Sequence, residues 1–275
     1  MQDPLHVNVG TVTVSYWHDN ADVARNLAEF TASLNSFPGM QSDWKEPVHV
    51  WLADSDARFD SIMAGRIPEW GIGAAMPASN TIFLRLTGNV RSTIHHELAH
   101  LALHSLVERV PLWFDEGYAS RAAGEWNRLG ALRVNWALMT GTVPTFGQVN
   151  RDIRSGAGHA ETAYALATAA VVFLERLGGE SGLERFLTNL AESGDFDRAL
   201  RQTHNVTFGQ FEVLWQRDLR KRYGWVLLFS SLTVFWAVLA VVLLSLWGWR
   251  RRRDKARRSA LDQGWVASED WDRVS

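Results

Sequence analysis

The sequence predicts an α+β fold: a small N-terminal β-sheet with helices, then a helix carrying a His-Glu-x-x-His motif, a helical C-terminal half and one transmembrane helix. Three observations support this prediction. Apolar stretches with strand-like alternation lie before residue 90. Apolar residues recur at helical spacing after that point. No charged residue occurs from Tyr223 to Trp249.

The first ninety residues alternate between strand-like and helix-like segments. Leu5 to Tyr16 alternates apolar and polar residues, which predicts one or two strands. Ala21 to Phe37 has apolar residues at helical spacing and is stopped by Pro38-Gly39. Further along we expect a strand, a short helix, an irregular Gly/Pro-rich loop and a third strand, at residues 47–52, 55–64, 65–79 and 80–86.

The second half is predicted to be helical. The motif helix runs from about Ser92 to Glu108, and Pro111 ends it and opens the next helix. Further helices follow at about residues 131–139, 161–177, 182–192, 196–203 and 208–223. We therefore expect an N-terminal α+β part and a helical part of one catalytic domain, a transmembrane helix, and a basic, flexible tail, at residues 1–90, 91–222, 225–249 and 250–275.

Composition excludes several classes of function. Lys and Arg number 28 and Asp and Glu 30, so the net charge of -2 gives no electrostatic case for nucleic acid as a partner. The chain has no cysteine, which excludes disulfides, thiolate metal ligands and a cysteine nucleophile. The sequence leaves the oligomeric state open.

The long uncharged segment predicts a transmembrane helix and therefore the lipid bilayer as a partner. Val226 to Leu246 is almost wholly apolar, and its 21 residues would span about 31 Å as a helix. Trp225 at one end, with Trp247 and Trp249 at the other, matches an interfacial aromatic belt. A buried core helix would rarely run so long without a polar face.

The distribution of basic residues predicts the orientation of this helix. Seven basic residues follow it closely and four precede it, which favours a cytoplasmic C-terminus and an extracytoplasmic catalytic domain in a single-pass membrane protein. Residues 1 to 20 show no signal peptide, so we expect a mature form from which the signal was removed. The alternative is a cytoplasmic domain held at the membrane by its tail.

His96-Glu97-Leu98-Ala99-His100 is the most informative motif. Residues four apart share a helix face, so both imidazoles can reach one metal ion, with Glu97 beside them. Glu116 adds a carboxylate at a separation that lets the chain fold back. Two imidazoles, one carboxylate and an open position describe a hydrolytic site with one Zn²⁺ ion, at which Glu97 would accept the proton of the attacking water.

The alternative interpretation of the motif is a polar helix surface that happens to carry histidines. His95 and His104 lie on the same segment, and His100 with His104 has the same spacing of four. In that frame Leu101 occupies the position of the base, whereas the frame of His96 and His100 places a glutamate there.

The motif followed by Trp113-Phe114-Asp115-Glu116-Gly117-Tyr118-Ala119 resembles the gluzincin zinc metallopeptidases, and among them the peptidase MA-like families. It is also similar to the Trp-x-x-Glu-Gly-x-Ala block of M1 aminopeptidases. The resemblance covers about residues 5 to 222. It implies that Glu116 is the third metal ligand, and that the strand Thr81 to Leu86 lies beside the cleft and pairs with the substrate backbone.

The sequence departs from the M1 pattern in two respects. Asp115 stands where M1 enzymes usually carry asparagine, and their upstream amine-recognition motif is missing, so aminopeptidase specificity is not implied. Asp115 competes with Glu116 as a ligand, but adjacent helical residues point about 100° apart, and the resemblance favours Glu116. Related gluzincins support the oxyanion with a tyrosine or histidine, for which Tyr164 is the candidate and His159 a second choice; alternatively, Tyr164 is a partly buried packing residue.

The predicted function is that of a membrane-anchored zinc-dependent metallopeptidase, which hydrolyses peptide or protein substrates by a metal-activated water with Glu97 as general base. The alternative is a catalytically silent, peptidase-like binding or scaffolding protein at the membrane. An intramembrane protease is excluded because charged residues, Arg91, Glu108 and Arg109, bracket the motif helix. The sequence identifies neither the substrate nor an endo- or exopeptidase, since loops such as 65–79 and 141–158 would form the pocket walls.

Overall fold

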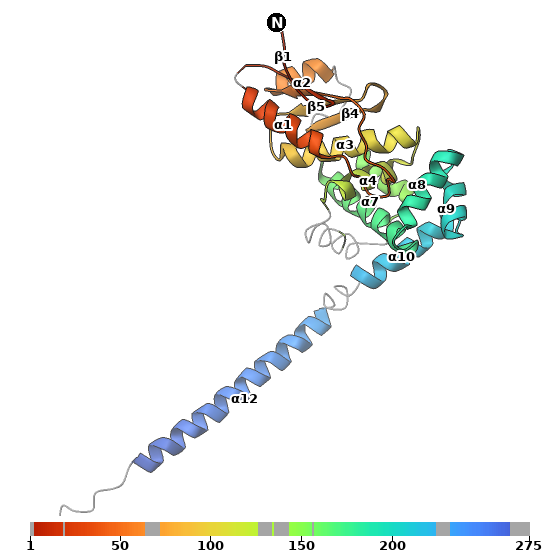
Figure 1. The fold of residues 1–275 in the computed structure, drawn as a ribbon. Helices are drawn as coiled ribbons and strands as arrows, with labels where there is room; N and C mark the ends of the chain where they lie inside the picture. The colour runs from red at the N-terminus through yellow and green to blue at the C-terminus, as the bar shows by residue number, and fades with distance from the viewer. Residues whose placement is uncertain are drawn as a thin grey trace, which may run out of the picture. The chain divides into compact units, whose positions relative to one another are not determined.

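The computed structural model describes residues 3–18, 20–63, 72–125, 134, 143–155, 157–223 and 232–264. Contacts divide the chain into two units, Met1–Gly224 and Trp225–Ser275. The first unit holds the sheet and the helices around it, and the second holds helix α12, Leu232–Gly264 (Figure 1). The predicted α+β character of the chain is confirmed by this first unit.

Five strands form one mixed sheet in the order β1-β2-β3-β5-β4. The central strands β2, β3 and β5 are mutually parallel, while β1 and β4 run antiparallel to their neighbours at the two edges. The register aligns Val14 with Val50 and Val50 with Ile82, so these apolar side chains share one face. In chain order the strands are β1 (Leu5–Val9), β2 (Val12–Tyr16), β3 (Val48–Ala53), β4 (Gly73–Met76) and β5 (Thr81–Arg85).

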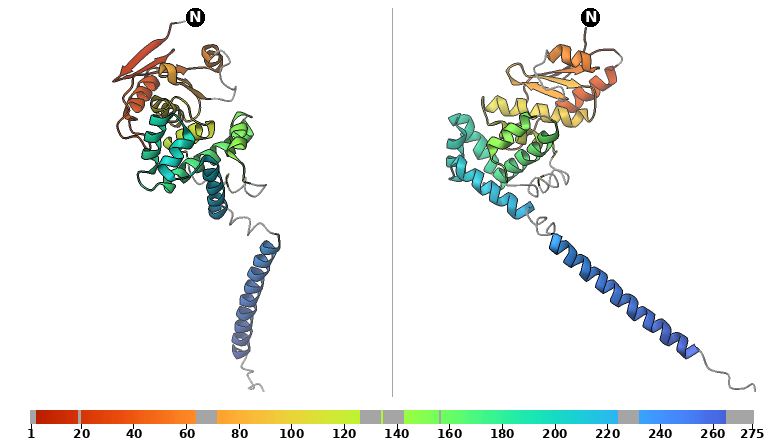
Figure 2. Two further views of the ribbon diagram at one scale, coloured as in Figure 1. Left: turned by 90° about the vertical axis from the view of Figure 1, so that its right-hand side faces the viewer. Right: turned by 180° about the vertical axis from the view of Figure 1, so that it is seen from behind.

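Helices cover both faces of the sheet (Figure 2). Helices α1 (Ala21–Ser33) and α3 (Val90–Leu106) pack on the face that carries the aligned apolar residues. The short helix α2 (Asp56–Met63) packs on the opposite face through Phe59 and Met63. Each fully buried side chain of this size contributes about 1.5–3 kcal/mol through removal from water, so the two layers fix the position of α3 against the sheet.

Helix α3 is buried on several sides. Its N-terminus is capped by Asn89, whose side chain accepts the backbone N–H of Ser92 at 3.4 Å. Leu98 and Leu101 are buried in the same core as the sheet, and the helix also contacts β4, β5 and α4. A helix held on these sides presents its remaining polar side chains in a fixed geometry.

The helical half packs around α4 (Leu112–Ala122), which follows α3. The ring of Trp113 is fully buried and stacks on Phe146 at 4.1 Å between centroids. A Cβ on Gly117 would lie 2.5 Å from the carbonyl oxygen of Ala167, so only glycine permits this approach of α4 to α7. The other helices are α6 (Phe146–Arg154), α7 (Ala157–Leu177), α8 (Gly182–Ser193), α9 (Phe196–His204) and α10 (Phe208–Tyr223).

The strand at the edge of the sheet is not the one that was predicted to pair with the substrate. The strand expected to pair with substrate is β5, which lies between β3 and β4 and is hydrogen-bonded on both sides. The edge strand is β4, which lies in the segment predicted as an irregular loop and is followed by a 3₁₀ turn, Pro77–Ser79. The sequence Gly73-Ala74-Ala75-Met76 has no β-branched residue, and pairing with β5 makes it a strand in spite of this low propensity.

The predicted transmembrane helix over 225–249 is wrong. Within the described parts of the chain, no helix combines the length and the apolar character needed to cross a bilayer. Helix α12 carries Arg250, Arg251, Arg252 and Arg253 directly after its apolar residues, and 225–231 of the predicted helix lie outside the described residues. The single-pass membrane location, the extracytoplasmic orientation and the bilayer as a partner depended on this helix and are corrected with it.

Two further expectations fall on segments outside the described residues. These are the helix at 131–139, of which the structure describes Val134 alone, and the end of the tail, 265–275.

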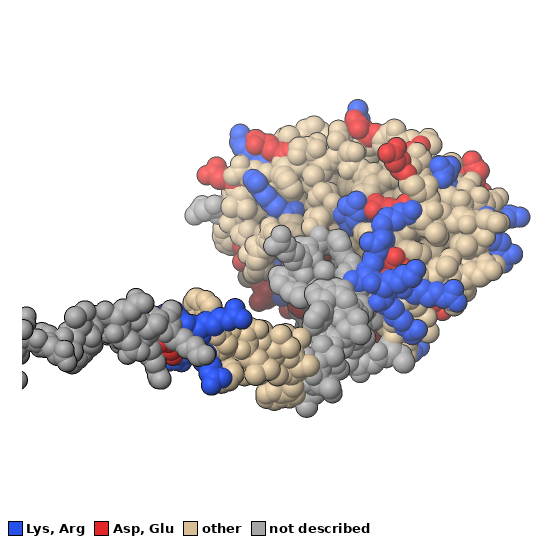
Figure 3. All heavy atoms as spheres, turned by 90° about the horizontal axis from the view of Figure 1, so that it is seen from below, with Lys and Arg blue, Asp and Glu red and all other residues tan. Residues whose placement is uncertain are grey.

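Charged side chains of both signs are interspersed on the face drawn in Figure 3. Ion pairs in the first unit include Arg121 with Glu175 at 3.0 Å and Arg176 with Asp218 at 2.8 Å. Lys and Arg side chains also gather in one group near the middle of that face.

Candidate active site

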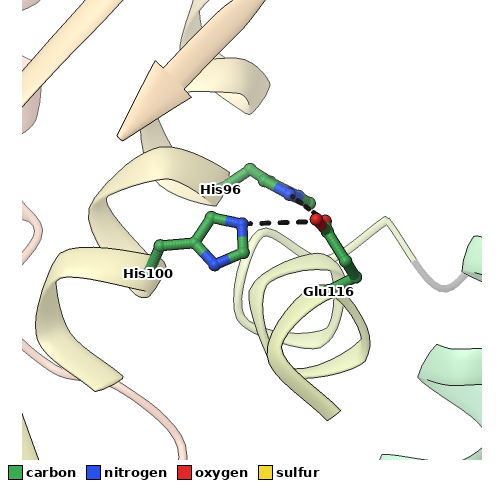
Figure 4. Close-up of side chains that lie close together, drawn as sticks. All are labelled: His96, His100 and Glu116. Carbon is green, nitrogen blue, oxygen red and sulfur yellow. Dashed lines mark ion pairs between the residues drawn. The ribbon is translucent and has the colours of Figure 1, made fainter. Parts of the chain in front are cut away.

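His96, His100 and Glu116 lie together and could hold one metal ion (Figure 4). The two imidazoles are one turn apart on α3, with ring centroids 5.0 Å apart. Glu116 projects from α4, and its Oε2 lies 3.4 Å from Nε2 of His96 and 3.7 Å from Nε2 of His100. One ligand atom from each residue lies within 4.8 Å of the others.

The geometry of the three donors fits a tetrahedral zinc site. Two ligands at about 2.0–2.1 Å from a tetrahedral ion are separated by about 3.4 Å from each other. The separations from Glu116 to the two Nε2 atoms match this value closely. The three side chains are 12–17% exposed, so the cluster is shielded from solvent but accessible from the cleft.

Asp115 holds His100 and is directed away from the three donors. Its Oδ1 lies 2.6 Å from Nδ1 of His100, and its Oδ2 lies 3.1 Å from Nε2 of His104. His104 in turn lies 3.2 Å from the carbonyl oxygen of Val107 through its Nδ1. Burial raises the pKa of Asp115, but the hydrogen bonds from His100 and His104 outweigh it and hold this pKa well below its usual range. Asp115 thus orients an imidazole while Glu116, one residue later, faces the centre.

Glu125 plays the corresponding part for His96. Its Oε2 lies 3.4 Å from Nδ1 of His96, and Ser92 donates its hydroxyl to Oε1 at 3.3 Å. Each histidine therefore turns Nδ1 to an outer carboxylate and Nε2 to Glu116. Histidines that bind metals commonly donate their other N–H in this way, which fixes the tautomer and leaves the inner nitrogen free for the metal.

The charges at the centre are strongly coupled. Burial opposes protonation of His96, but its hydrogen bonds with Glu116 and Glu125 raise the pKa to about 9. Burial raises the pKa of Glu116, but its hydrogen bonds with His100 and His96 lower it to about 2. A metal ion that binds here would compete with the protons of these imidazoles, so metal affinity would fall as the pH falls.

Glu97 lies beside the three donors and is buried, with 8% of its surface exposed. Burial raises the pKa of its carboxyl group. The charges of His96 and His100 and a hydrogen bond from the backbone N–H of Ala75 on β4 act in the opposite direction but are weaker. A Cβ on Gly73 would lie 2.8 Å from Oε1 of Glu97, so glycine lets the edge strand approach the carboxylate. The sheet edge and the motif helix therefore meet at this residue.

A cavity of about 480 Å³ joins these groups. Strand β4 forms one wall, and Leu112, Ile153, Arg154 and Tyr164 contribute to the rest. Burial, followed by the nearby carboxylates of Glu116 and Glu97, raises the pKa of Tyr164, so its hydroxyl stays protonated.

The cavity brings together most of the residues singled out from the sequence: His96, Glu97, His100, Glu116 and Tyr164. The side chain of His159, the second candidate for the oxyanion, lies outside the described residues. Sequence reasoning missed Glu125, because it follows α4 at no recognisable spacing from the motif. The segments 65–79 and 141–158, expected to form the pocket walls, contain β4 and Arg154, but the sequence identified neither the strand nor this arginine.

The comparison with known protein families gives a match. The family model described as the Peptidase MA superfamily matches residues 31–221, which is more than half of the chain and includes the whole cluster. No curated protein matches the chain.

Proposed function

Because the chain belongs to the peptidase MA superfamily, we propose that it is a gluzincin-type zinc metallopeptidase that hydrolyses peptide bonds in peptide or protein substrates. The observation that carries the proposal is the convergence of His96, His100 and Glu116 within 4.8 Å, with the buried Glu97 lining the same cavity. A glutamate beside two histidines and a carboxylate is the arrangement that metal-assisted hydrolysis needs.

Zinc is the metal that the donors favour. The set consists of two imidazoles and one carboxylate, and the chain has no cysteine to offer a softer ligand. When bound, a zinc ion would supply Lewis acidity, which polarises the scissile carbonyl and acidifies the attacking water. His96, His100 and Glu116 would hold it, with Asp115 and Glu125 fixing the imidazoles from outside.

Glu97 acts as the general base in this proposal. Its carboxylate is close enough to the donors to take a proton from the attacking water and to pass it to the leaving amine. The hydrogen bond from the Ala75 amide restrains its orientation, and burial keeps its pKa above the usual value. A raised pKa makes the carboxylate a stronger base and brings it closer to neutral pH, where one group can accept a proton in one step and release it in the next.

Strand β4 binds the substrate backbone in this proposal. It is the edge strand, and Gly73, Ala74 and Ala75 line the cavity with side chains too small to block a peptide. A peptide that adds to this edge as a strand passes directly over Glu97 and the metal ligands.

Tyr164 donates its hydroxyl to the oxyanion that forms at the scissile carbonyl. The support is its position in the cavity and a pKa raised by burial, which keeps the proton on the oxygen. We further propose that one catalytic domain comprises both predicted parts, with 1–90 supplying β4 and 91–222 supplying the ligands and Tyr164.

The test compares Glu97→Gln with wild type in metal analysis and in hydrolysis of a peptide library. The variant is expected to retain zinc and to lose turnover, and a chelator should abolish wild-type activity. Glu108→Gln serves as the control, because its side chain is 88% exposed at the end of the same segment. Hydrolysis by Glu97→Gln would refute the role of this residue, and metal-free wild-type protein without activity would favour a silent binding protein.

A further inference from the structure

Arg154 places a positive charge in the wall of the active-site cavity. It is the last residue of α6 and lines the cavity together with the metal-ligand cluster, Glu97 and Tyr164. Among the cavity-lining residues in the described ranges it is the only lysine or arginine.

The carboxylates of the cavity already have partners. Asp115 binds His100 and His104, and Glu116 contacts His96 and His100. Within the described residues, no ion pair joins Arg154 to any carboxylate. The described carboxylates of the cavity therefore leave the exposed guanidinium of Arg154 open to a ligand that enters the cavity.

A purely structural role would be interaction with the C-terminus of α6, where cations are favourable. Arg151 belongs to the same last turn of the helix. Its Nη1 would lie 3.9 Å from a Cβ on Gly147, so its side chain runs back along the helix, and it does not line the cavity. Arg154 therefore differs from Arg151 in lining the active-site cavity, and Arg151 is the matched control on the same helix.

We propose that Arg154 binds a carboxylate group of the substrate and thereby selects acidic peptides. The inference rests on the proposed function and deepens it by naming the substrate class. A guanidinium presents parallel N–H donors that match a carboxylate in a bidentate pair. Leu112 and Ile153 line the same cavity, so the pair would form at its exposed rim, next to apolar side chains.

The carboxylate has two sources: an acidic side chain or the C-terminus of the peptide. Binding is measured by fluorescence anisotropy in the full chain carrying Glu97→Gln, so that no peptide is consumed. Four labelled peptides share one apolar sequence. Each carries either glutamate or glutamine at one position and either a free or an amidated C-terminus, in all four combinations.

The proposal predicts that a carboxylate tightens binding about tenfold, the effect of one charge-assisted pair. Arg154→Gln is expected to remove this preference and Arg154→Glu to reverse it, whereas Arg151→Gln leaves it unchanged. The peptide pair that shows the difference identifies the source of the carboxylate.

Several results would overturn the inference: equal affinity for acidic and neutral peptides, a preference that survives Arg154→Glu, or no binding of any peptide. Wild-type kinetics add a second criterion, because Arg154→Gln should raise KM for acidic peptides and leave kcat unchanged. A kcat loss on all peptides would place Arg154 at the transition state instead. An Arg154-dependent preference in a protein that hydrolyses nothing would keep this inference and reject the proposed function.

Discussion

Gly73→Ala tests the contact between the sheet edge and the proposed general base. The new Cβ would lie 2.7 Å from Cγ2 of Thr93 and 2.8 Å from Oε1 of Glu97, whereas ordinary van der Waals contact begins at 3.4 Å. The overlap with the carboxylate is therefore 3.4 − 2.8 = 0.6 Å. Either Glu97 or strand β4 must move by about this amount.

The expected displacement of Glu97 predicts a change in kcat. A misplacement of about 1 Å at a reacting group costs about 100-fold, so a shift of about 0.6 Å should lower kcat by about tenfold. Overpacking should also lower the free energy of unfolding by about 1–3 kcal/mol. The zinc content should stay at one ion per chain, because neither Gly73 nor Glu97 is a proposed ligand.

The assay is steady-state hydrolysis of one peptide, with metal content and urea unfolding measured on the same samples. Gly209→Ala is the control, since no heavy atom lies within 4 Å of its added Cβ and its helical position favours alanine. A Gly73→Ala protein with wild-type kcat and one zinc ion would refute the idea that β4 positions Glu97.

Three further predictions concern Asp115, Tyr164 and His204. Asp115→Ala removes the carboxylate that orients His100, so zinc affinity should fall 10- to 100-fold in competition with a chromogenic chelator; unchanged affinity would show that His100 needs no such support. Tyr164→Phe should lower kcat about 100-fold at constant KM and zinc content, and an unchanged rate would remove Tyr164 from the site. Both ring nitrogens of His204 are buried without a hydrogen-bond partner in the described structure, and burial, followed by the charge of Arg185, lowers its pKa. The unfolded chain then binds a proton more readily, so the free energy of unfolding should decrease as the pH falls below about 6.5. His204→Leu should lose less stability than wild type between about pH 7.5 and about pH 5.5 in urea unfolding, and equal losses would contradict this assignment.

The part of the site whose residues are close together in the sequence could be predicted from the sequence. The spacing of His96 and His100 alone places two imidazoles on one helix face, and Glu97 follows from the same turn. Three predicted strand segments correspond to β1 with β2, to β3 and to β5, because alternating apolar residues mark a half-buried strand directly.

The parts that could not be predicted depend on contacts between distant segments. Strand β4 has no strand-like composition and exists because β5 offers it a partner. Glu125 reaches His96 only because α4 returns the chain to the start of α3, which no spacing in the sequence reveals. The transmembrane prediction rested on composition alone, and within the described residues no helix is long and apolar enough to span a membrane.

The central claim is that His96, His100 and Glu116 bind one zinc ion for catalysis. The most direct measurement is zinc titration of the metal-free protein, followed by peptide hydrolysis and by X-ray absorption at the zinc edge. The account predicts that activity rises to a plateau at one equivalent, with two imidazole nitrogens and one carboxylate oxygen at about 2.0–2.2 Å from the ion. Activity without zinc, or a bound zinc ion whose coordination is unchanged in His96→Ala and His100→Ala, would contradict it.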